Sequence, residues 1–357
     1  MKHQILYLLV TVFYLFSCTG ETGIQERLPS HDDELLSIDF EEAALTRSIG
    51  SKPLATGTLF KVYAYNQGTD IQNATVPIAE GTYAIRETDD GSGNKKQTIK
   101  AHNNEALELY AGTYDLYLVS YNSDSETPSV TDTSAAPSLI AALPNDKDFL
   151  YTSMRNVGVR SVNAGDTNFL ITLNKPFERM CSGLLFKVKA KNGTHPVTPR
   201  SLRLMSIKVS HLSAPCAFLL GSNVLPVFNT ADKYTGTLSY GTEGKPDASF
   251  RNNDGNVSAS GVVTTATPEA GIYQVLPTNG SATLEIDVVL EVGYDNTTAF
   301  TKTNYPYHIT VNKALQAGSC YEFTFSLTFY DSYVPDNLEL DIMPYIPSQQ
   351  DTGHVGG

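Results

Sequence analysis

The sequence predicts an all-β protein built from two antiparallel β-sandwich domains in tandem. Short apolar segments with a period of two recur along the chain and alternate with turn-forming clusters of Gly, Pro, Asn and Asp. The aromatic residues are 20 Tyr and 15 Phe with no Trp, a profile that suits strands. A length of 357 residues, 41% of them hydrophobic, is enough for two domains that each bury a core.

The chain begins with the pattern of an export signal. Lys2 gives a positive start, and residues 5–16 (ILYLLVTVFYLF) form an apolar run that is too short to span a membrane as a helix. The run ends in the letters LFSC, which resemble the signal box of bacterial lipoproteins, where the signal is removed before a cysteine that receives lipid. We therefore expect residues 1–17 to be a signal peptide and Cys18 to carry an acyl chain such as palmitate, which anchors the precursor in a Gram-negative outer membrane. The alternative is a plain secretory peptide in which Cys18 is incidental.

A candidate strand lies between this signal and the first dense β segments. Leu36, Ile38 and Phe40 alternate with polar residues, which is the pattern of a strand with one buried face. A lone basic residue, Arg47, follows this strand, and Ser48 opens the next part of the chain. The sequence thus places a strand with one apolar face ahead of the domain to which it would belong, with Arg47 between the two.

Strand-like segments follow through the body of the chain. They cover residues 58–65, 106–121, 169–173, 184–190, 201–209, 282–292, 307–311 and 321–330. The polar clusters at residues 89–94 and 252–256 fit turns better than calcium loops, because a bidentate Glu is missing at the required distance. No helical pattern of comparable length competes, although residues 137–143 (PSLIAAL) could form one or two helical turns.

Two stretches in opposite halves of the chain share a pattern. Residues 107–121 and 313–327 each read as a leucine, then Ala-Gly, then a Tyr that opens an alternating strand. A tight turn with glycine at the bend would feed each strand. We infer a duplicated plan, with a first sandwich over residues 48–166 and a second over residues 167–357.

The C-terminal region holds a second candidate strand of the same kind. Leu338, Leu340 and Ile342 alternate with Glu339 and Asp341 and follow a proline that should separate them from the preceding strand. Burial of three such side chains contributes roughly 1.5 to 3 kcal/mol each. The tail of residues 335–357 is therefore a candidate donor strand for another chain, and the alternative is that it forms the last strand of its own domain.

Charge and motif content limit the kinds of function. The formal net charge of −13 disfavours nucleic acid as a partner, because phosphate binding needs basic patches. The seven histidines are scattered without an H-E-x-x-H pattern, and no G-x-S-x-G motif occurs. We expect no catalytic residue, no metal site and no cofactor, hence no enzyme. Apart from Cys18, the cysteines Cys181, Cys216 and Cys320 allow at most one disulfide and are expected to be buried thiols.

Five features, taken in their order along the chain, resemble a known family. They are the lipoprotein box at Cys18, the acidic segment that ends in Leu45-Thr46-Arg47, and the stretches AGTYDLYLVSYN, FLYTS and PYIPSQQDTGHVGG. Together they resemble the fimbrillin family, the lipoprotein-derived pilins of type V pili in anaerobic Gram-negative bacteria. One departure is Tyr345, where relatives often have Trp after the proline, and this exchange preserves an aromatic side chain.

The resemblance implies two transthyretin-like sandwich domains and a route of assembly. A lipoprotein precursor reaches the outer membrane through Cys18, an arginine-specific protease cuts after Arg47, and the propeptide of residues 18–47 leaves with its detachable strand. A strand from another fimbrial subunit then fills the open place by donor-strand exchange. The product is an extracellular fimbrium that supports adhesion, with a host or bacterial surface ligand as a further partner. Arg27 is a poorer candidate for the cut because it would leave the strand attached.

Two questions stay open at the level of sequence. A surface lipoprotein that binds glycans for nutrient uptake would also be a lipid-anchored β-sandwich protein, although sugar platforms usually rely on exposed Trp, which this chain lacks. Arg47 favours the fimbrial interpretation, because a permanently anchored binder has no use for a detachable strand. Within that interpretation, stalk and tip roles are both compatible with the sequence, whereas Arg47 argues against an anchor.

Overall fold

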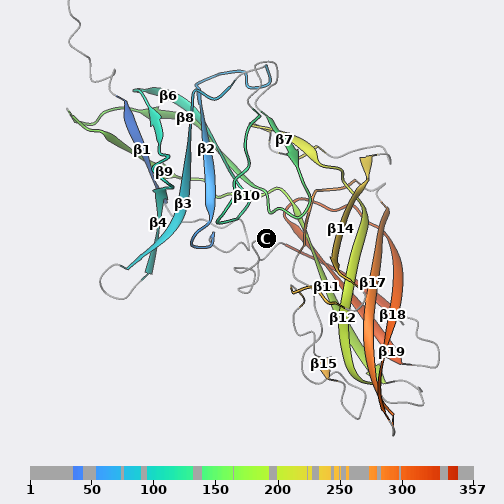
Figure 1. Ribbon diagram of the computed structural model, residues 1–357. Coiled ribbons are helices and arrows are strands. Elements are labelled where there is room, and N and C mark those ends of the chain that lie inside the picture. The colour runs from blue at the N-terminus through green and yellow to red at the C-terminus, as the bar shows by residue number, and fades with distance from the viewer. Residues whose placement is uncertain are drawn as a thin grey trace, which may run out of the picture.

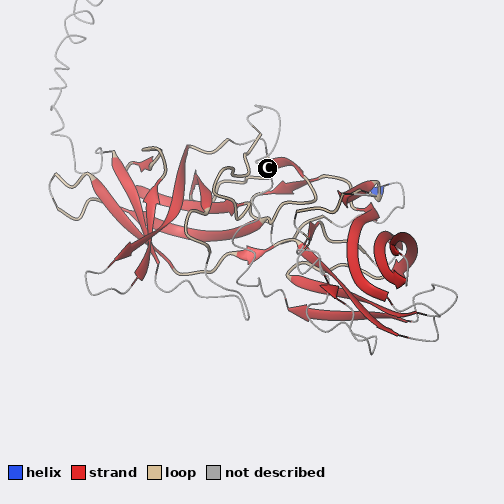
Figure 2. Cartoon of the chain, turned by 60° about the horizontal axis from the view of Figure 1, so that its bottom comes forward, coloured by secondary structure: helices blue, strands red, loops and turns tan. Residues whose placement is uncertain are grey.

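The structure is a computed structural model that describes most of the chain between Leu35 and Pro344. The described residues are 35–42, 54–73, 76–89, 95–131, 139–163, 165–192, 199–222, 224–226, 233–242, 245–248, 250, 255–256, 273–279, 283–296, 299–329 and 337–344. These residues contain no α-helix, and Figure 2 accordingly shows a molecule drawn almost wholly in strands and loops. No helix among them is long and apolar enough to cross a lipid bilayer. The predicted all-β class is confirmed.

The strands form two lobes (Figure 1), and the larger sheet of the first lobe is antiparallel throughout. Its order is β10, β8, β6, β2, β3, β4, with bounds β2 Leu59–Asn66, β3 Ala79–Asp89, β4 Lys95–Ala101, β6 Gly112–Ser120, β8 Leu150–Val159 and β10 Glu178–Arg179. Strands β2 and β6 are buried on both faces, which explains their nearly unbroken runs of apolar residues.

A smaller sheet covers one face of this large sheet. It has the order β5, β1, β9, with bounds β1 Leu36–Glu42, β5 Leu107–Leu109 and β9 Asn168–Leu173. One cluster of buried side chains draws members from both sheets, including Phe60 and Val62 of β2 and Ile171 of β9. The first lobe is thus a two-layer arrangement around one hydrophobic core.

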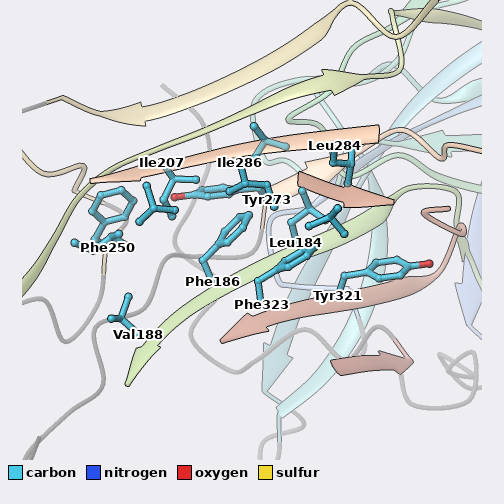
Figure 3. Packing of buried hydrophobic residues seen from close by; sticks show 14 of the residues in the cluster. Leu184, Phe186, Val188, Ile207, Phe250, Tyr273, Leu284, Ile286, Tyr321 and Phe323 are labelled. Carbon is cyan, nitrogen blue, oxygen red and sulfur yellow. The ribbon is translucent and has the colours of Figure 1, made fainter. Parts of the chain in front are cut away.

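The second lobe repeats the two-layer plan with longer strands. One sheet has the order β16, β11, β19, β20, with bounds β11 Ser182–Asn192, β16 Tyr273–Val275, β19 Ser319–Phe329 and β20 Asn337–Pro344. The other has the order β14, β12, β17, β18, with bounds β12 Pro199–Leu212, β14 Gly236–Gly241, β17 Thr283–Asn296 and β18 Ala299–Asn312, and β15 (Gly255–Asn256) also pairs with β12. Figure 3 shows the core between them, where the rings of Phe186 and Phe323 stack at a centroid distance of 5.3 Å.

A third cluster of buried side chains lies between the two lobes. A short pair, β7 (Leu139–Leu143) with β13 (Cys216–Leu219), bridges them. Phe218 of β13 packs edge-on against Phe149 and Tyr151 of the first lobe, with ring centroids 5.0 and 4.9 Å away. The contact between the lobes is therefore a packed aromatic interior rather than a bare linker.

One sequence expectation is met and two differ. The turn expected within residues 107–121 is present: the chain turns at Tyr110 and Ala111, and β5 and β6 lie in different sheets. The helical turns considered for residues 137–143 are wrong where they are described, since residues 139–143 form β7 and hydrogen-bond to β13. Strands β9 and β10 follow the boundary expected at residue 166, yet they pair with β1 and β8, so residues up to Arg179 contribute to sheets of the first lobe.

The two lobes share one arrangement around their opening strands. Strand β1 lies between the antiparallel β5 and the parallel β9, and strand β11 lies between the antiparallel β16 and the parallel β19. The two Tyr residues of the repeated sequence pattern also act alike. The hydroxyl of Tyr114 donates to the carbonyl of Tyr110 at 2.9 Å, and that of Tyr321 donates to the carbonyl of Ala314 at 3.0 Å. Each ties the start of its strand to the preceding turn.

Candidate strand-binding site

The three apolar residues predicted near the N-terminus share one buried face of β1. Leu36 and Ile38 are fully buried and Phe40 is 3% exposed, whereas Leu35 at the strand's beginning is 46% exposed. Because β1 is the middle strand of its sheet, it is hydrogen-bonded along both edges. We call the space that Leu36–Glu42 fills between β5 and β9 the β1 slot.

The two walls of the β1 slot run in opposite directions. On one side β5 is antiparallel to β1, with Ile38 opposite Leu107. On the other side β9 is parallel to β1, with Ser37 opposite Asn168, and the N–H of Ser37 donates to the carbonyl of Thr167 at 2.8 Å. The main chain of Ser37 therefore faces the β9 wall. Successive residues of a strand point their main-chain groups to opposite edges, so Ile38 faces the β5 wall.

Aromatic rings of the large sheet form the floor of the β1 slot. The ring of Phe40 meets that of Tyr83 edge-on at 4.8 Å and 87°, and that of Phe60 edge-on at 6.4 Å. The rings of Tyr83 and Phe60 stack at 5.6 Å. Edge-to-face and offset-stacked geometries are the favoured ones for aromatic pairs. An aromatic side chain at the position of Phe40 can therefore pack edge-on against both rings.

The hydroxyl of Tyr83 sits between β1 and β5. It accepts a hydrogen bond from the N–H of Leu107 at 2.8 Å and donates one to the carbonyl of Ile38 at 2.6 Å. Tyr83 belongs to β3 in the opposite sheet and is fully buried, so its side chain reaches across the core to the small sheet. Burial raises the pKa of Tyr83 above its usual range, and the bond from Leu107 opposes this in part. The hydroxyl therefore keeps its proton at neutral pH and remains a donor.

Gly81 allows β5 to come this close to β3. A Cβ atom at this position would lie 2.5 Å from the backbone nitrogen of Leu107, closer than any side chain tolerates. The neighbouring Thr82 N–H donates to the carbonyl of Glu105 at 2.8 Å, which holds the start of β5 against β3. The β5 wall thus depends on a glycine in β3.

Two shallow hollows flank the small sheet. One, of about 500 Å³, lies beside the start of β1 and is lined by Leu35, Ile78, Leu109 and Tyr110 among others. The other, of about 410 Å³, lies between β8 and β9. Leu35, Ile78 and Tyr110 are each about half exposed, so apolar surface continues outward from the slot.

The C-terminal candidate strand is found in its own chain. Strand β20 pairs with β19 antiparallel, with the backbone of Leu338 opposite Phe325, Leu340 opposite Phe323 and Ile342 opposite Tyr321. It lies at the end of its sheet, so within the described residues it has one strand neighbour where β1 has two. This is the alternative noted from the sequence, and donation of the strand to another chain stays a prediction.

The remaining predicted residues divide into two groups. Cys18, Arg47 and Ser48 lie outside the described residues, so lipidation and cutting stay predictions. The other three cysteines are buried and none is in a disulfide; burial raises the pKa of Cys181 to about 12 and that of Cys216 to about 11. Within the described part of the chain, no group of three or more potential metal ligands converges.

Comparison with known proteins gives structural likenesses only. No family model and no curated protein matches the sequence. A candidate cell adhesion protein from Parabacteroides distasonis ATCC 8503 is similar in structure, with a TM-score of 0.41 and 10% identity over 87% of this chain and 97% of that chain. A fimbrilin from Porphyromonas gingivalis W83 gives 0.36 and 11% over 88% and 97%. The tip fimbrial protein Mfa3 from Porphyromonas gingivalis gives 0.33 and 10% over 87% and 99%.

At such low TM-scores and identities, what these proteins do carries no weight for this chain. The case for its function therefore rests on its own residues.

Two of the most informative residues of the β1 slot, Tyr83 and Gly81, were missed by sequence reasoning. A Tyr in an alternating segment looks like any core residue, and a glycine inside a strand signals only some close approach. Their partner Leu107 could be identified only once the fold brought β3 and β5 together.

Proposed function

We propose that this protein is a stalk or tip subunit of a cell-surface fimbrium, exported as a lipoprotein, cut after Arg47 and polymerised by donor-strand exchange. One observation carries the proposal: β1 is a middle strand of its sheet, yet it is the first described strand of the chain. Arg47 stands between its end at Glu42 and the start of β2 at Leu59. A cut there would release β1 without severing the rest of the lobe.

Release of β1 would leave the small sheet of the first lobe without its middle strand. Burial of Leu36, Ile38 and Phe40 contributes about 1.5 to 3 kcal/mol per side chain, and the hydrogen bonds along both edges of β1 add to this. An empty β1 slot would expose an apolar floor between two strands with unpaired main-chain groups. Such an opening is a template for an extended strand from another chain.

The C-terminal strand suits this opening. Its apolar residues at 338, 340 and 342 match the spacing of those at 36, 38 and 40. In its own chain β20 lies at a sheet edge with β19 as its neighbour, whereas in the β1 slot it would be paired along both edges. A move from an edge to a middle position gains main-chain hydrogen bonds, which favours exchange between subunits. On this proposal the two lobes are the two sandwich domains of the fimbrillin plan.

The test is the N-terminus of the mature protein. Protein released from the native host's cells is analysed by N-terminal sequencing and intact mass for the wild type, for Arg47→Ala and for Arg27→Ala as a matched control. We expect a start at Ser48 and polymer ladders for the wild type and Arg27→Ala, and neither for Arg47→Ala. A mature wild-type protein that keeps a lipidated Cys18 and forms no polymer would refute the proposal and favour a permanently anchored glycan-binding lipoprotein.

A further inference from the structure

The Tyr83 hydroxyl occupies an unusual place in the small sheet. It accepts from Leu107 of β5 and donates to Ile38 of β1, so it stands between two residues that lie opposite each other in the strand pairing. The phenol comes from the opposite sheet, stacks on Phe60 and accepts the bond from Leu107, and these two contacts do not involve β1. Phe40 of β1 adds a third, edge-on contact. The hydroxyl therefore belongs to the slot, although the strand that fills the slot also packs on its ring.

Removal of β1 would change the state of this hydroxyl. The bond from the Leu107 N–H lies within the remaining lobe and persists, but the acceptor at Ile38 is lost. Water can take the place of this acceptor while the slot is open. Once a strand closes the slot, a buried O–H that lacks an acceptor is costly, and a strand that supplies a carbonyl at this point avoids the cost. The empty slot would then present one fixed donor among apolar side chains.

This donor discriminates between the two strand directions. In a strand, the residues whose side chains face the core all point their main-chain groups to the same edge. In β1 that edge is β5, as the bond from Tyr83 to Ile38 shows. A strand inserted backwards would turn the carbonyls of its core-facing residues toward β9 and away from the hydroxyl. Register is selected by the apolar side chains instead, because a shift by one residue would turn them outward.

We propose that Tyr83 sets the direction of the strand that fills the β1 slot, by donating a hydrogen bond to the carbonyl of its middle core-facing residue. The proposal deepens the strand-exchange function above and rests on it. The occupant is the C-terminal strand of a second copy, with Leu340 in the place of Ile38 and the strand parallel to β9. Tyr83 is thus a positioning residue for assembly.

Cross-linking in the polymer tests direction directly. In the structure Asp39 lies opposite Leu170, which is 52% exposed on the outer side of β9. With Leu340 at the position of Ile38, the predicted direction brings Asp341 opposite Leu170, and the reverse direction brings Glu339 there instead. Polymers are therefore made with Leu170→Cys paired with either Asp341→Cys or Glu339→Cys and oxidised with diamide. We expect the Asp341 pair to cross-link between subunits in clear excess over the Glu339 pair.

The same experiment in Tyr83→Phe isolates the hydroxyl, with Tyr114→Phe as the matched control. Tyr114 lies in the same core, but its hydroxyl donates to Tyr110 and not to β1. We expect Tyr83→Phe to lower the excess of the Asp341 pair roughly two- to tenfold, the effect of one hydrogen bond, and Tyr114→Phe to leave it unchanged. An excess unaltered in Tyr83→Phe, or an excess of the Glu339 pair in the wild type, would overturn the proposal.

A second measurement does not require polymer. A site for a sequence-specific protease is inserted after Arg47, the purified precursor is cut, and loss of the fragment that holds β1 is followed by mass spectrometry of the retained complex. Loss roughly two- to tenfold faster in Tyr83→Phe than in Tyr114→Phe would support the bond from Tyr83 to the resident strand. Equal rates would refute it. A wild type that makes no polymer but shows this difference would refute strand exchange and leave the role of the hydroxyl intact.

Discussion

Replacement of Phe40 by alanine tests how much of the first lobe's stability depends on β1. Phe40 is 3% exposed and contacts the rings of Tyr83 and Phe60 at 4.8 and 6.4 Å. Removal of a buried Phe side chain costs about 3 to 5 kcal/mol, because transfer energy is lost and a cavity remains. The same change at Leu35, which is 46% exposed, should cost less than about 0.5 kcal/mol.

The assay is urea unfolding of the intact chain, with Leu35→Ala as the matched control. Two-lobed proteins need not unfold in one step, so each transition is fitted separately. We expect Phe40→Ala to lower the midpoint of the transition that belongs to the first lobe and to leave that of the second lobe in place. The reasoning would be refuted if both alanine variants unfolded like the wild type, since the β1 face would then contribute nothing to the core.

Three further predictions concern the β5 wall and the buried interior. Gly81→Ala should destabilise the first lobe by roughly 1 to 3 kcal/mol, because the added methyl group would force β5 away from β3. The control Gly158→Ala, where no atom lies near the added Cβ, should change stability little. Urea unfolding measures both variants, and equal effects would contradict the close approach at Gly81. Asp148→Asn should cost about 3 to 5 kcal/mol in the same assay, because the nearly buried Arg179 would lose the negative charge of Asp148 beside it. A loss below about 1 kcal/mol would count against the pair. Burial raises the pKa of Cys181 to about 12, so its thiol should stay unreactive toward maleimide at pH 8 until urea unfolds the protein. Peptide mass spectrometry identifies the labelled cysteine, and fast labelling of Cys181 in the native state would contradict its burial.

The local structure of the site could be predicted from sequence, and its surroundings could not. The alternation of Leu36, Ile38 and Phe40 predicts a strand with one buried face, and β1 has both. The same pattern says nothing about partners: β1 pairs with β9, whose pattern is only that of another short strand far along the chain. The segment at residues 106–121 shows the limit well. Its Ala-Gly step predicts a turn, but nothing in the sequence indicates that the strands on either side of the turn, β5 and β6, join different sheets. Periodicity reports burial, and the choice of neighbour depends on packing across the whole lobe.

The parallel pairing of β1 with β9 has a consequence for how the first lobe closes. Parallel neighbours cannot be joined by a hairpin, and here the first and last parts of the lobe must meet, Ser37 beside Asn168. In the uncut precursor this meeting is intramolecular, so the tether keeps β1 at a high local concentration and its insertion is independent of how much protein is present. The cut proposed after Arg47 would remove this tether, and a strand that left the slot would then compete with free strands at their bulk concentration. On the proposed function, the segment that holds β1 would act as an internal chaperone strand, which completes the lobe until one peptide bond is cut.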